Sequence, residues 1–158
     1  MKQKIRIYAV SIAISLGIGV ASAFLTRNNM DIYSLVKTPP LSPPAFLFPL
    51  VWTILYILMG IGSAMILTTA TSPLSERKNA LSVYALSLFF NFFWSIIFFN
   101  MRAFLFSFIW LIALLILIVT TIFRYSRINK TAAYLQIPYA IWVAFAGYLN
   151  LGIWLLNR

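Results

Sequence analysis

Aromatic and amide side chains recur at helical spacing in two apolar segments, and they are the residues of this chain best suited to binding chemistry. In one segment the recurring positions are Tyr84, Ser87, Asn91, Trp94 and Phe98. In the other they are Tyr139, Trp142, Ala146 and Asn150. Because residues three, four and seven apart share a helix face, the two stripes predict a cavity walled by aromatic rings. Such a cavity, with few hydrogen-bonding groups and no charge, suits a large, flat, apolar molecule.

Three of the side chains are predicted to lie near the middle of a membrane. Trp52 follows the start of its segment by about ten residues, or ~15 Å along a helix, and Trp142 and Asn91 lie at a similar depth. Tryptophan usually prefers the membrane interfaces, and a buried amide needs a hydrogen-bond partner. A ligand site explains these positions, and the alternatives are ordinary packing of the indoles and helix-to-helix bonding of the amide.

The residue types needed for most enzymatic chemistry are missing. The 158 residues contain no Cys and no His, and the two acids, Asp31 and Glu76, lie in predicted loops. We therefore expect no metal site, no cofactor and no conventional acid–base catalysis. The net charge of +10 does not indicate nucleic-acid binding, because the Lys and Arg residues form short clusters between apolar segments rather than a patch.

The composition is that of an integral membrane protein. Hydrophobic residues make up 63% of the chain and charged residues 9%, with a mean hydropathy of +0.95. Each apolar stretch has the length of about 20 residues that a spanning helix needs, and the stretches are 5–25, 44–69, 80–100, 103–123 and 132–156. The predicted fold is therefore an all-α membrane protein, a five-transmembrane-helix bundle forming a single domain over 1–158. The long first loop, 26–43, is a candidate lid.

Positive charge predicts the orientation. The N-terminus and the links 71–79 and 124–130 share one side of the bundle and carry eight of the twelve Lys and Arg residues. The positive-inside rule then places the N-terminus in the cytoplasm and the first loop outside. A different interpretation of the first segment is a cleaved secretory signal ending at Ala21-Ser22-Ala23, which would leave four spans.

Prolines cluster where the second segment begins. We expect Ser42 to be the N-cap and Pro43 and Pro44 to open the helix, where a missing N–H costs little. Pro49 is expected to free the carbonyl of Ala45 and to bend the helix, thereby positioning Trp52. Pro138 is expected to interrupt the last segment in the same way.

Three stretches in order resemble one known family. They are "PPAFLFPLVWTILYILMG" (Pro43–Gly60), "LSLFFNFFWSIIFF" (Leu86–Phe99) and "IPYAIWVAFAGYLNLGIWLLN" (Ile137–Asn157). They are similar to the translocator protein family, also called the TspO/MBR, tryptophan-rich sensory protein or peripheral-type benzodiazepine receptor family, and this chain resembles a bacterial member. The resemblance implies five helices with an uncleaved first helix, a homodimer in the cytoplasmic membrane, and a cavity covered by the first loop.

The same resemblance implies a ligand and its contacts. Members bind porphyrins such as protoporphyrin IX and benzodiazepine-type compounds. By motif position the family contacts map onto Tyr33, Pro44, Phe46, Asn91, Trp94 and Ala146, to which the stripes add Tyr139 and Asn150. The predicted function is a membrane receptor or sensor for tetrapyrroles. The alternatives are porphyrin breakdown by light and oxygen, with Trp52 and Trp142 as redox partners, and translocation of porphyrin or lipid.

The first loop departs from the family pattern. Where family members often have a Trp-Tyr pair and a Trp before the prolines, this chain has Ile32-Tyr33 and Leu41. The predicted lid therefore has fewer aromatic rings to stack on a flat ligand. Tyr148 also lacks a nearby basic residue of the kind found in the cholesterol-recognition segment of animal members, so sterol binding is not expected.

Overall fold

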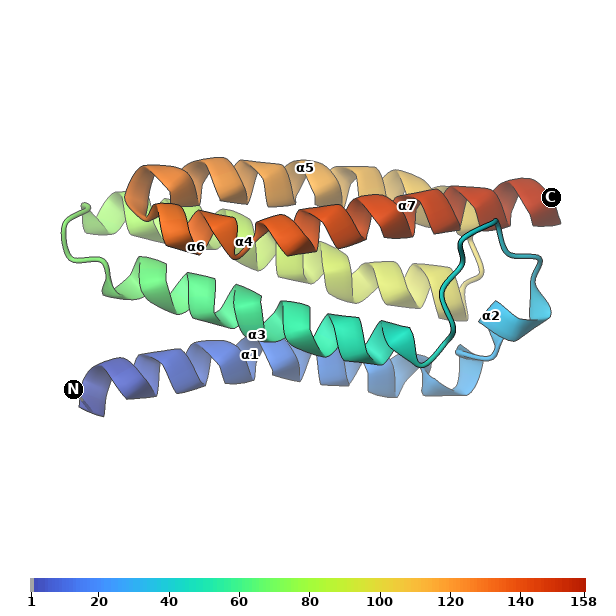
Figure 1. The fold of residues 1–158 in the computed structure, drawn as a ribbon, viewed down its shortest axis with the longest axis horizontal. Coiled ribbons are helices and arrows are strands. Elements are labelled where there is room, and N and C mark those ends of the chain that lie inside the picture. The colour runs from blue at the N-terminus through green and yellow to red at the C-terminus, as the bar shows by residue number, and fades with distance from the viewer. Residues whose placement is uncertain (1) are drawn as a thin grey trace.

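Five long apolar helices run side by side along the molecule in a computed structural model that describes residues 2–158. Figure 1 shows them as one antiparallel bundle whose N- and C-termini lie at opposite ends. The candidate spans are Lys2–Asn29, Leu47–Thr68, Leu74–Asn100, Phe104–Ile128 and Lys130–Asn157. The predicted all-α, five-span membrane fold is confirmed. The described residues contain no strand.

The spans are built from longer and shorter helical pieces. In chain order these are α1 (Lys2–Thr26), η1 (Arg27–Asn29), α2 (Ile32–Leu35), α3 (Leu47–Thr68), α4 (Leu74–Ser95), η2 (Ile96–Asn100), α5 (Phe104–Ile128), α6 (Lys130–Tyr134) and α7 (Ile137–Asn157). The η2 piece is a π-helical turn in which Met101 N–H donates to the Ile96 carbonyl at 3.1 Å. Such turns interrupt α-helices where the backbone has to widen.

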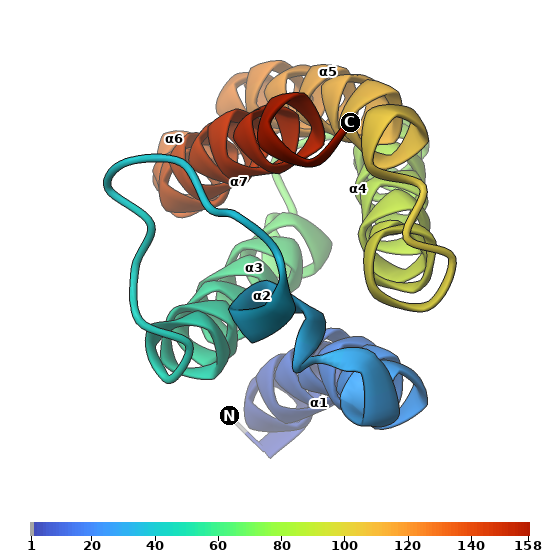
Figure 2. The same ribbon diagram turned by 90° about the vertical axis from the view of Figure 1, so that its right-hand side faces the viewer.

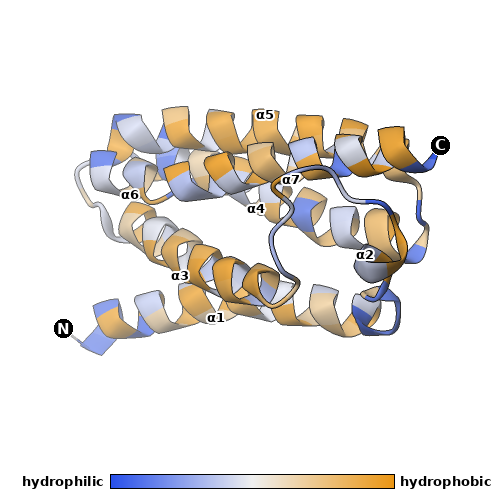
Figure 3. Ribbon diagram, turned by 45° about the vertical axis from the view of Figure 1, so that its right-hand side comes forward, coloured by the Kyte–Doolittle hydropathy of each residue, from blue (hydrophilic) through white to orange (hydrophobic). Residues whose placement is uncertain are grey.

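Several helices extend beyond the apolar stretches. α4 begins at Leu74, not at residue 80, and α5 continues to Ile128, not 123. Hydropathy marks the part of a helix that suits lipid, whereas hydrogen bonding continues into the polar link. Glu76 lies in the first turn of α4, where a negative charge is favourable beside the positive end of the helix dipole. Figure 3 shows hydrophilic residues concentrated at the two ends of the bundle.

The predicted start of the second span is wrong. α3 begins at Leu47 with Phe46 as its N-cap, and the Ser42 hydroxyl donates to the Pro39 carbonyl at 2.6 Å instead of capping the helix. Pro49 is therefore in the first turn, where a missing N–H removes no helical bond. The Ala45 carbonyl accepts from Phe48 N–H at 3.3 Å. The predicted bend at Pro49 has no cause, because no carbonyl is freed there.

The predicted interruption of the last span is confirmed. α6 ends at Tyr134 and α7 begins at Ile137, with Pro138 in its first turn. The break brings the side chain of Gln136 to the α3 backbone, since a Cβ on Gly62 would lie 2.7 Å from its amide nitrogen. The two parts of the span remain in line in Figure 1.

The two ends of the bundle differ in what closes them. At one end short links join α3 to α4 and α5 to α6, beside the N-terminus. At the other end residues 30–46 run over the bundle, and Figure 2 shows α2 lying across it between the surrounding helices. We call these the closed end and the cavity end. The grouping of links matches the one from which the orientation is predicted.

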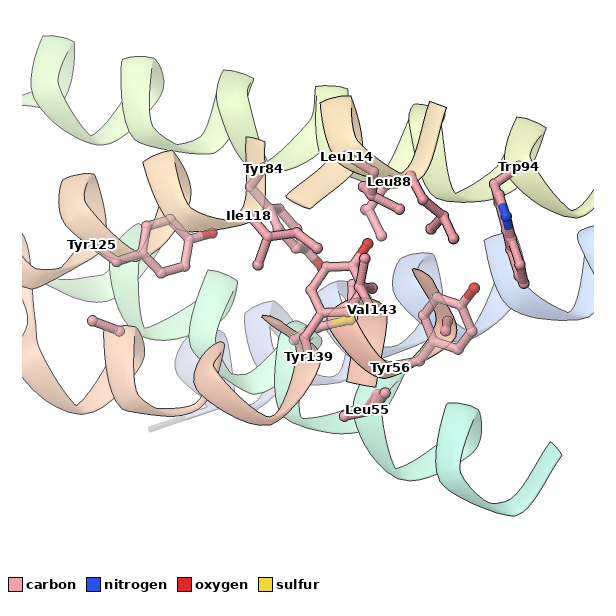
Figure 4. Packing of buried hydrophobic residues seen from close by; sticks show 14 of the residues in the cluster. Leu55, Tyr56, Tyr84, Leu88, Trp94, Leu114, Ile118, Tyr125, Tyr139 and Val143 are labelled. Atoms are coloured by element: carbon pink, nitrogen blue, oxygen red, sulfur yellow. The ribbon is translucent and has the colours of Figure 1, made fainter. Parts of the chain in front are cut away.

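The core is densest between the middle of the bundle and the closed end. Leu114, Ile118 and Tyr125 of α5 are fully buried, as are Met59 and Ile66 of α3. Figure 4 shows Leu88, Leu114 and Ile118 gathered near Tyr84 and Tyr139, with Trp94 standing apart further along α4. The side chains that fill this region belong mainly to α3, α4, α5 and α7, and three of these helices, α3, α4 and α7, also form walls of the cavity.

Candidate functional site

A cavity of about 200 Å³ lies inside the cavity end of the bundle. Helices α1, α3, α4 and α7 provide its walls, and Met30 and Tyr33 cover it from the segment between α1 and α3. The lining consists of Gly19, Ser22, Ala23, Thr26, Met30, Tyr33, Ala45, Phe48, Pro49, Trp52, Tyr56, Asn91, Trp94, Ser95, Phe98, Phe99, Ala146, Leu149, Asn150 and Ile153. Among the described residues the lining includes no Lys, Arg, Asp or Glu, so an enclosed ligand meets mainly apolar and aromatic surface.

Asn91 joins three helices at the inner wall of the cavity. Its side-chain oxygen accepts from the Tyr56 hydroxyl at 3.0 Å, and its amide nitrogen donates to the Tyr139 hydroxyl at 2.9 Å. The side chain is 1% exposed, and in such a place an unpaired amide would be costly. Asn91 therefore bonds α3 and α7 to α4 and lines the cavity at the same time. Helix bonding and a place in the lining, which the sequence presented as alternatives, occur together.

Asn150 forms a second polar centre on the other side of the cavity. Its side-chain oxygen accepts from Trp94 Nε1 at 3.2 Å and from the Ser107 hydroxyl at 2.9 Å. Its amide nitrogen donates to the Phe104 carbonyl at 2.7 Å. These bonds occupy the amide and fix the plane of the Trp94 indole. The two asparagines thus orient the aromatic walls rather than offering free donors to a ligand.

Trp52 provides a flat aromatic surface in the cavity. Its ring stacks on Tyr56 with centroids 5.6 Å apart, and it meets the edge of Tyr139 at 6.2 Å. Both tyrosines are bonded to Asn91, so the hydrogen bonds of Asn91 indirectly hold the indole in place. The indole is half-buried and faces the cavity.

The π-helical turn η2 brings further aromatic rings to the wall. Phe98 lies 5.5 Å from the Trp94 ring and 5.0 Å from Phe99, measured between centroids, and all three line the cavity. In a regular α-helix adjacent residues point about 100° apart. The wider π turn places the neighbouring Phe98 and Phe99 side chains on the same cavity.

The segment after α2, residues 36–46, is here called the strap, and it is attached mainly to α7. The Asn157 side chain accepts from Lys37 N–H and donates to the Lys37 carbonyl, each at 2.9 Å. The Tyr148 hydroxyl donates to the Pro40 carbonyl at 2.8 Å. Pro39 fits against Gly152, where an added Cβ would lie 2.6 Å from the proline ring. Ahead of the strap, Tyr33 meets the edge of Phe48 at 5.1 Å.

Six of the residues predicted from sequence to bind a ligand line this cavity, and four do not. Those in the lining are Tyr33, Trp52, Asn91, Trp94, Ala146 and Asn150. Pro44 and Phe46 lie in the turn before α3, and the Phe46 side chain is 70% exposed because the helix begins later than predicted. Tyr139 is buried behind Asn91.

Trp142 is placed differently from its predicted partner Trp52. It is absent from the lining and packs against Phe48, with ring centroids 5.9 Å apart. Phe48 itself lines the cavity, so Trp142 contacts a wall residue without belonging to the lining. Helical periodicity places residue 142 on the correct side of α7, but it does not show which neighbouring side chain stands in front.

The contribution of α1 was missed at the sequence level. Gly19, Ser22, Ala23 and Thr26 form one wall of the cavity. They are small residues spaced three and four apart, a pattern that indicates a helix face approached closely by something else. The spacing of these small residues is the sequence signal from which the α1 wall could have been predicted.

Comparisons with known proteins agree on one family. The sequence model of the TspO/MBR family matches residues 10–155. A "Tryptophan-rich protein TspO" from Chlorobaculum tepidum is 37% identical over 158 residues, which is 99% of each chain. The "Translocator protein" of Bos taurus is 30% identical over 91% of this chain and 85% of its own. A "Tryptophan-rich sensory protein" from Cereibacter sphaeroides is 30% identical over 79% of this chain and 76% of its own.

Proposed function

The chain belongs to the TspO/MBR family, and from that premise we propose that it is a membrane receptor or sensor for tetrapyrroles such as protoporphyrin IX. The observation that carries the proposal is the cavity beneath α2, whose lining combines Trp52, Trp94 and Phe98 with two asparagines already bonded within the protein. Flat aromatic molecules gain most from such walls, since stacking does not require free donors. The names of two relatives, translocator protein and tryptophan-rich sensory protein, support a role in sensing or carrying a ligand.

The cavity is small for a ligand of this size. At about 200 Å³ it is smaller than the roughly 300–1,000 Å³ of typical small-molecule sites. A tetrapyrrole therefore requires the cavity to widen. The strap is the element best suited to move, because its bonds to α7 involve exposed residues at the end of the bundle, whereas the walls are fixed by buried asparagines.

Binding in the dark tests the proposal. Purified protein in detergent is titrated with protoporphyrin IX while tryptophan fluorescence is recorded, and we expect saturable quenching. Trp52→Phe should weaken binding by up to about tenfold, because a stacked aromatic contact contributes roughly 0.5–1.5 kcal/mol. Trp154→Phe is the matched control, since Trp154 lies outside the cavity. Quenching that does not saturate, or an equal effect of the two substitutions, would contradict the proposed site.

A light-driven activity is the second candidate. An indole in the cavity can relay one electron: the light-excited porphyrin takes an electron from the indole and passes it to molecular oxygen, which becomes superoxide. The indole radical cation then recovers an electron from the porphyrin, which is left oxidised by one electron. Trp52 is in the lining and Trp142 stands behind Phe48, so Trp52 is the first donor on this hypothesis. Illumination of the complex in the presence of oxygen should accelerate loss of porphyrin absorbance over that of free porphyrin, and removal of oxygen should abolish the acceleration. The Trp52→Phe variant should lose most of this acceleration, and an unchanged rate would exclude the indole.

We further propose a cytoplasmic N-terminus in the cell membrane, and a homodimer. The closed end carries the larger share of Lys and Arg, including Lys4, Arg77 and Arg124, which the positive-inside rule places in the cytoplasm. Because the chain has no Cys, single Thr71→Cys and Ser34→Cys variants can be labelled with an impermeant maleimide in intact cells. Only the Ser34→Cys variant should react.

Crosslinking in membranes tests the dimer, which is proposed from family resemblance.

A further inference from the structure

A second depression lies on the outside of the bundle, between the start of α5 and the end of α7. It is an open groove of about 540 Å³, separate from the cavity, and its residues include Arg102, Leu105, Phe106, Ile109 and Trp154. The side chains of Leu105, Phe106 and Ile109 are 42%, 50% and 54% exposed. They belong to the first six residues of a spanning helix, so the groove occupies about 9 Å of depth just inside the membrane boundary.

Two arginines lie near this groove, at the cavity end of the bundle. Arg102 is part of its lining and precedes the fourth span by two residues. Arg158 follows the last span directly, and its guanidinium carbon lies 5.4 Å from the centroid of the Trp154 ring. Arg158 is outside the lining itself but contacts the lining residue Trp154. Both arginines flank the ends of spans that reach the same end of the bundle. Neither acid of the chain, Asp31 or Glu76, belongs to the groove lining.

We propose that this groove is a binding site for an anionic phospholipid, with the headgroup phosphate at Arg102 and Arg158 and an acyl chain along Leu105, Phe106 and Ile109. The charge at the boundary matches the phosphate, and the apolar surface directly below it matches the chain. Guanidinium groups are well suited to phosphate because they present several donors in one plane. The half-buried Trp154 belongs to the same groove and contacts Arg158, and an indole is favoured at a membrane interface.

The charges also argue against a second copy of this chain as the occupant. In a twofold contact the same patch meets itself, so the Arg102 and Arg158 side chains of two copies would approach one another. Such an arrangement brings four positive charges together with no acid of the groove to balance them. A phospholipid with net negative charge relieves the repulsion between the arginines.

Brominated lipids provide a direct test, because bromine quenches an indole only at short range. The protein is reconstituted with a small fraction of brominated phosphatidylglycerol or brominated phosphatidylcholine, and the Trp154 signal is obtained by difference from Trp154→Phe. We expect half-maximal quenching of this signal at about tenfold less phosphatidylglycerol than phosphatidylcholine, a preference of roughly 1.4 kcal/mol. The double variant Arg102→Gln/Arg158→Gln should lose the preference. Arg124→Gln/Arg127→Gln, altered at the closed end, should keep it.

Each other outcome contradicts the site. Equal quenching by the two lipids would mean that the groove holds no particular headgroup. A preference that survives the double variant would place the anion elsewhere. Protection of Trp154 from both lipids would show that protein covers the groove. Gln removes the positive charge but keeps a polar side chain, and because Trp154 fluorescence also reports on folding, a misfolded variant is recognised by the emission maximum before brominated lipid is added.

Discussion

The closed end and the cavity end use the same helices but pack them in different ways. Near the closed end α1 and α3 touch at Gly60, where an added Cβ would lie 2.5 Å from the Ile12 Cα. Towards the cavity end α1 and α3 are in contact through an aromatic ring, because Gly19 of α1 faces the side chain of Tyr56 of α3. Beyond that point Trp52, Trp94 and Phe98 hold the helices apart around the cavity. Small residues allow the helices to pack closely near one end of the bundle. At the other end, aromatic side chains that are oriented by hydrogen bonds to asparagines surround a cavity.

This difference in packing indicates which end of the bundle can change shape more easily. Backbone in contact with backbone cannot yield without moving a whole helix. Rings at the cavity end are fixed by a few hydrogen bonds to Asn91 and Asn150, and the strap by bonds at the surface. We therefore expect substitutions at the closed end to affect folding, and substitutions at the cavity end to affect chiefly ligand entry and affinity.

The largest effect is expected from Gly60→Ala. The new methyl group meets the backbone of Ile12, so α1 and α3 must separate along their length. Overpacking typically costs about 1–3 kcal/mol, and we expect a loss at the upper end of that range because backbone must move. Thermal unfolding in detergent measures the loss. Gly17→Ala is the matched control, because nothing lies within 4 Å of its added Cβ, and it should change stability by less than about 1 kcal/mol. Similar losses for both would remove the proposed difference in packing.

Asn91→Leu is expected to have an intermediate effect. It leaves the hydroxyl groups of Tyr56 and Tyr139 without their bonds to the amide, and an unpaired buried polar group costs about 1–3 kcal/mol. It should also weaken protoporphyrin binding, because Trp52 packs on both tyrosines.

The comparison at the closed end is Ser15→Ala, which removes a hydroxyl bonded to Tyr84 at 2.7 Å. One hydrogen bond between membrane helices averages about 0.6 kcal/mol, so the loss of stability should be smaller and ligand affinity unchanged. Chemical denaturation and dark titration of the two variants distinguish the ends. The comparison fails if Ser15→Ala weakens porphyrin binding as much as Asn91→Leu does.

Asn157→Leu should change kinetics more than stability. It removes both bonds to the backbone of Lys37, so the strap leaves α7 more often. We expect protoporphyrin IX to associate about threefold faster or more, with a stability change below about 1.5 kcal/mol, since exposed hydrogen bonds contribute little. Stopped-flow fluorescence measures the rate. Asn28→Leu is the control, being an exposed asparagine outside the strap. An unchanged rate would show that the ligand does not enter beneath the strap.

The smallest effect is expected from Trp142→Phe. Because Trp142 is outside the lining and packs on the wall residue Phe48, dark binding of protoporphyrin IX should change by no more than about twofold, less than for Trp52→Phe, since the lost contact is indirect. Equal weakening by the two substitutions would instead mean that Phe48 moves aside and that the ligand reaches both indoles.

Much of the architecture was predictable from local pattern. Apolar length gave the five spans, and the stripes through Asn91 and Asn150 pointed to the buried face of α4 and α7. The start of α3 was not predictable, because Pro43 and Pro44 are compatible with either a helical first turn or an extended turn. The choice depends on the strap, where Ser42 bonds to Pro39 and Leu41 takes a left-handed φ of 65°.

By itself the sequence determined that the protein folds in a membrane and which side-chain types are available to line a site. A chain with so few charges folds in lipid, and a chain without His or Cys has little but aromatic rings and amides with which to line a site. Tertiary structure alone decided which rings reach the cavity, how small it is, and which residues of α1 complete it. The physical reason is that periodicity fixes the face of a residue, whereas access to a cavity depends on what packs in front of it. Trp52 and Trp142 are predicted from the sequence to lie at a similar depth, but only Trp52 lines the cavity, and Trp142 packs against the ring of Phe48.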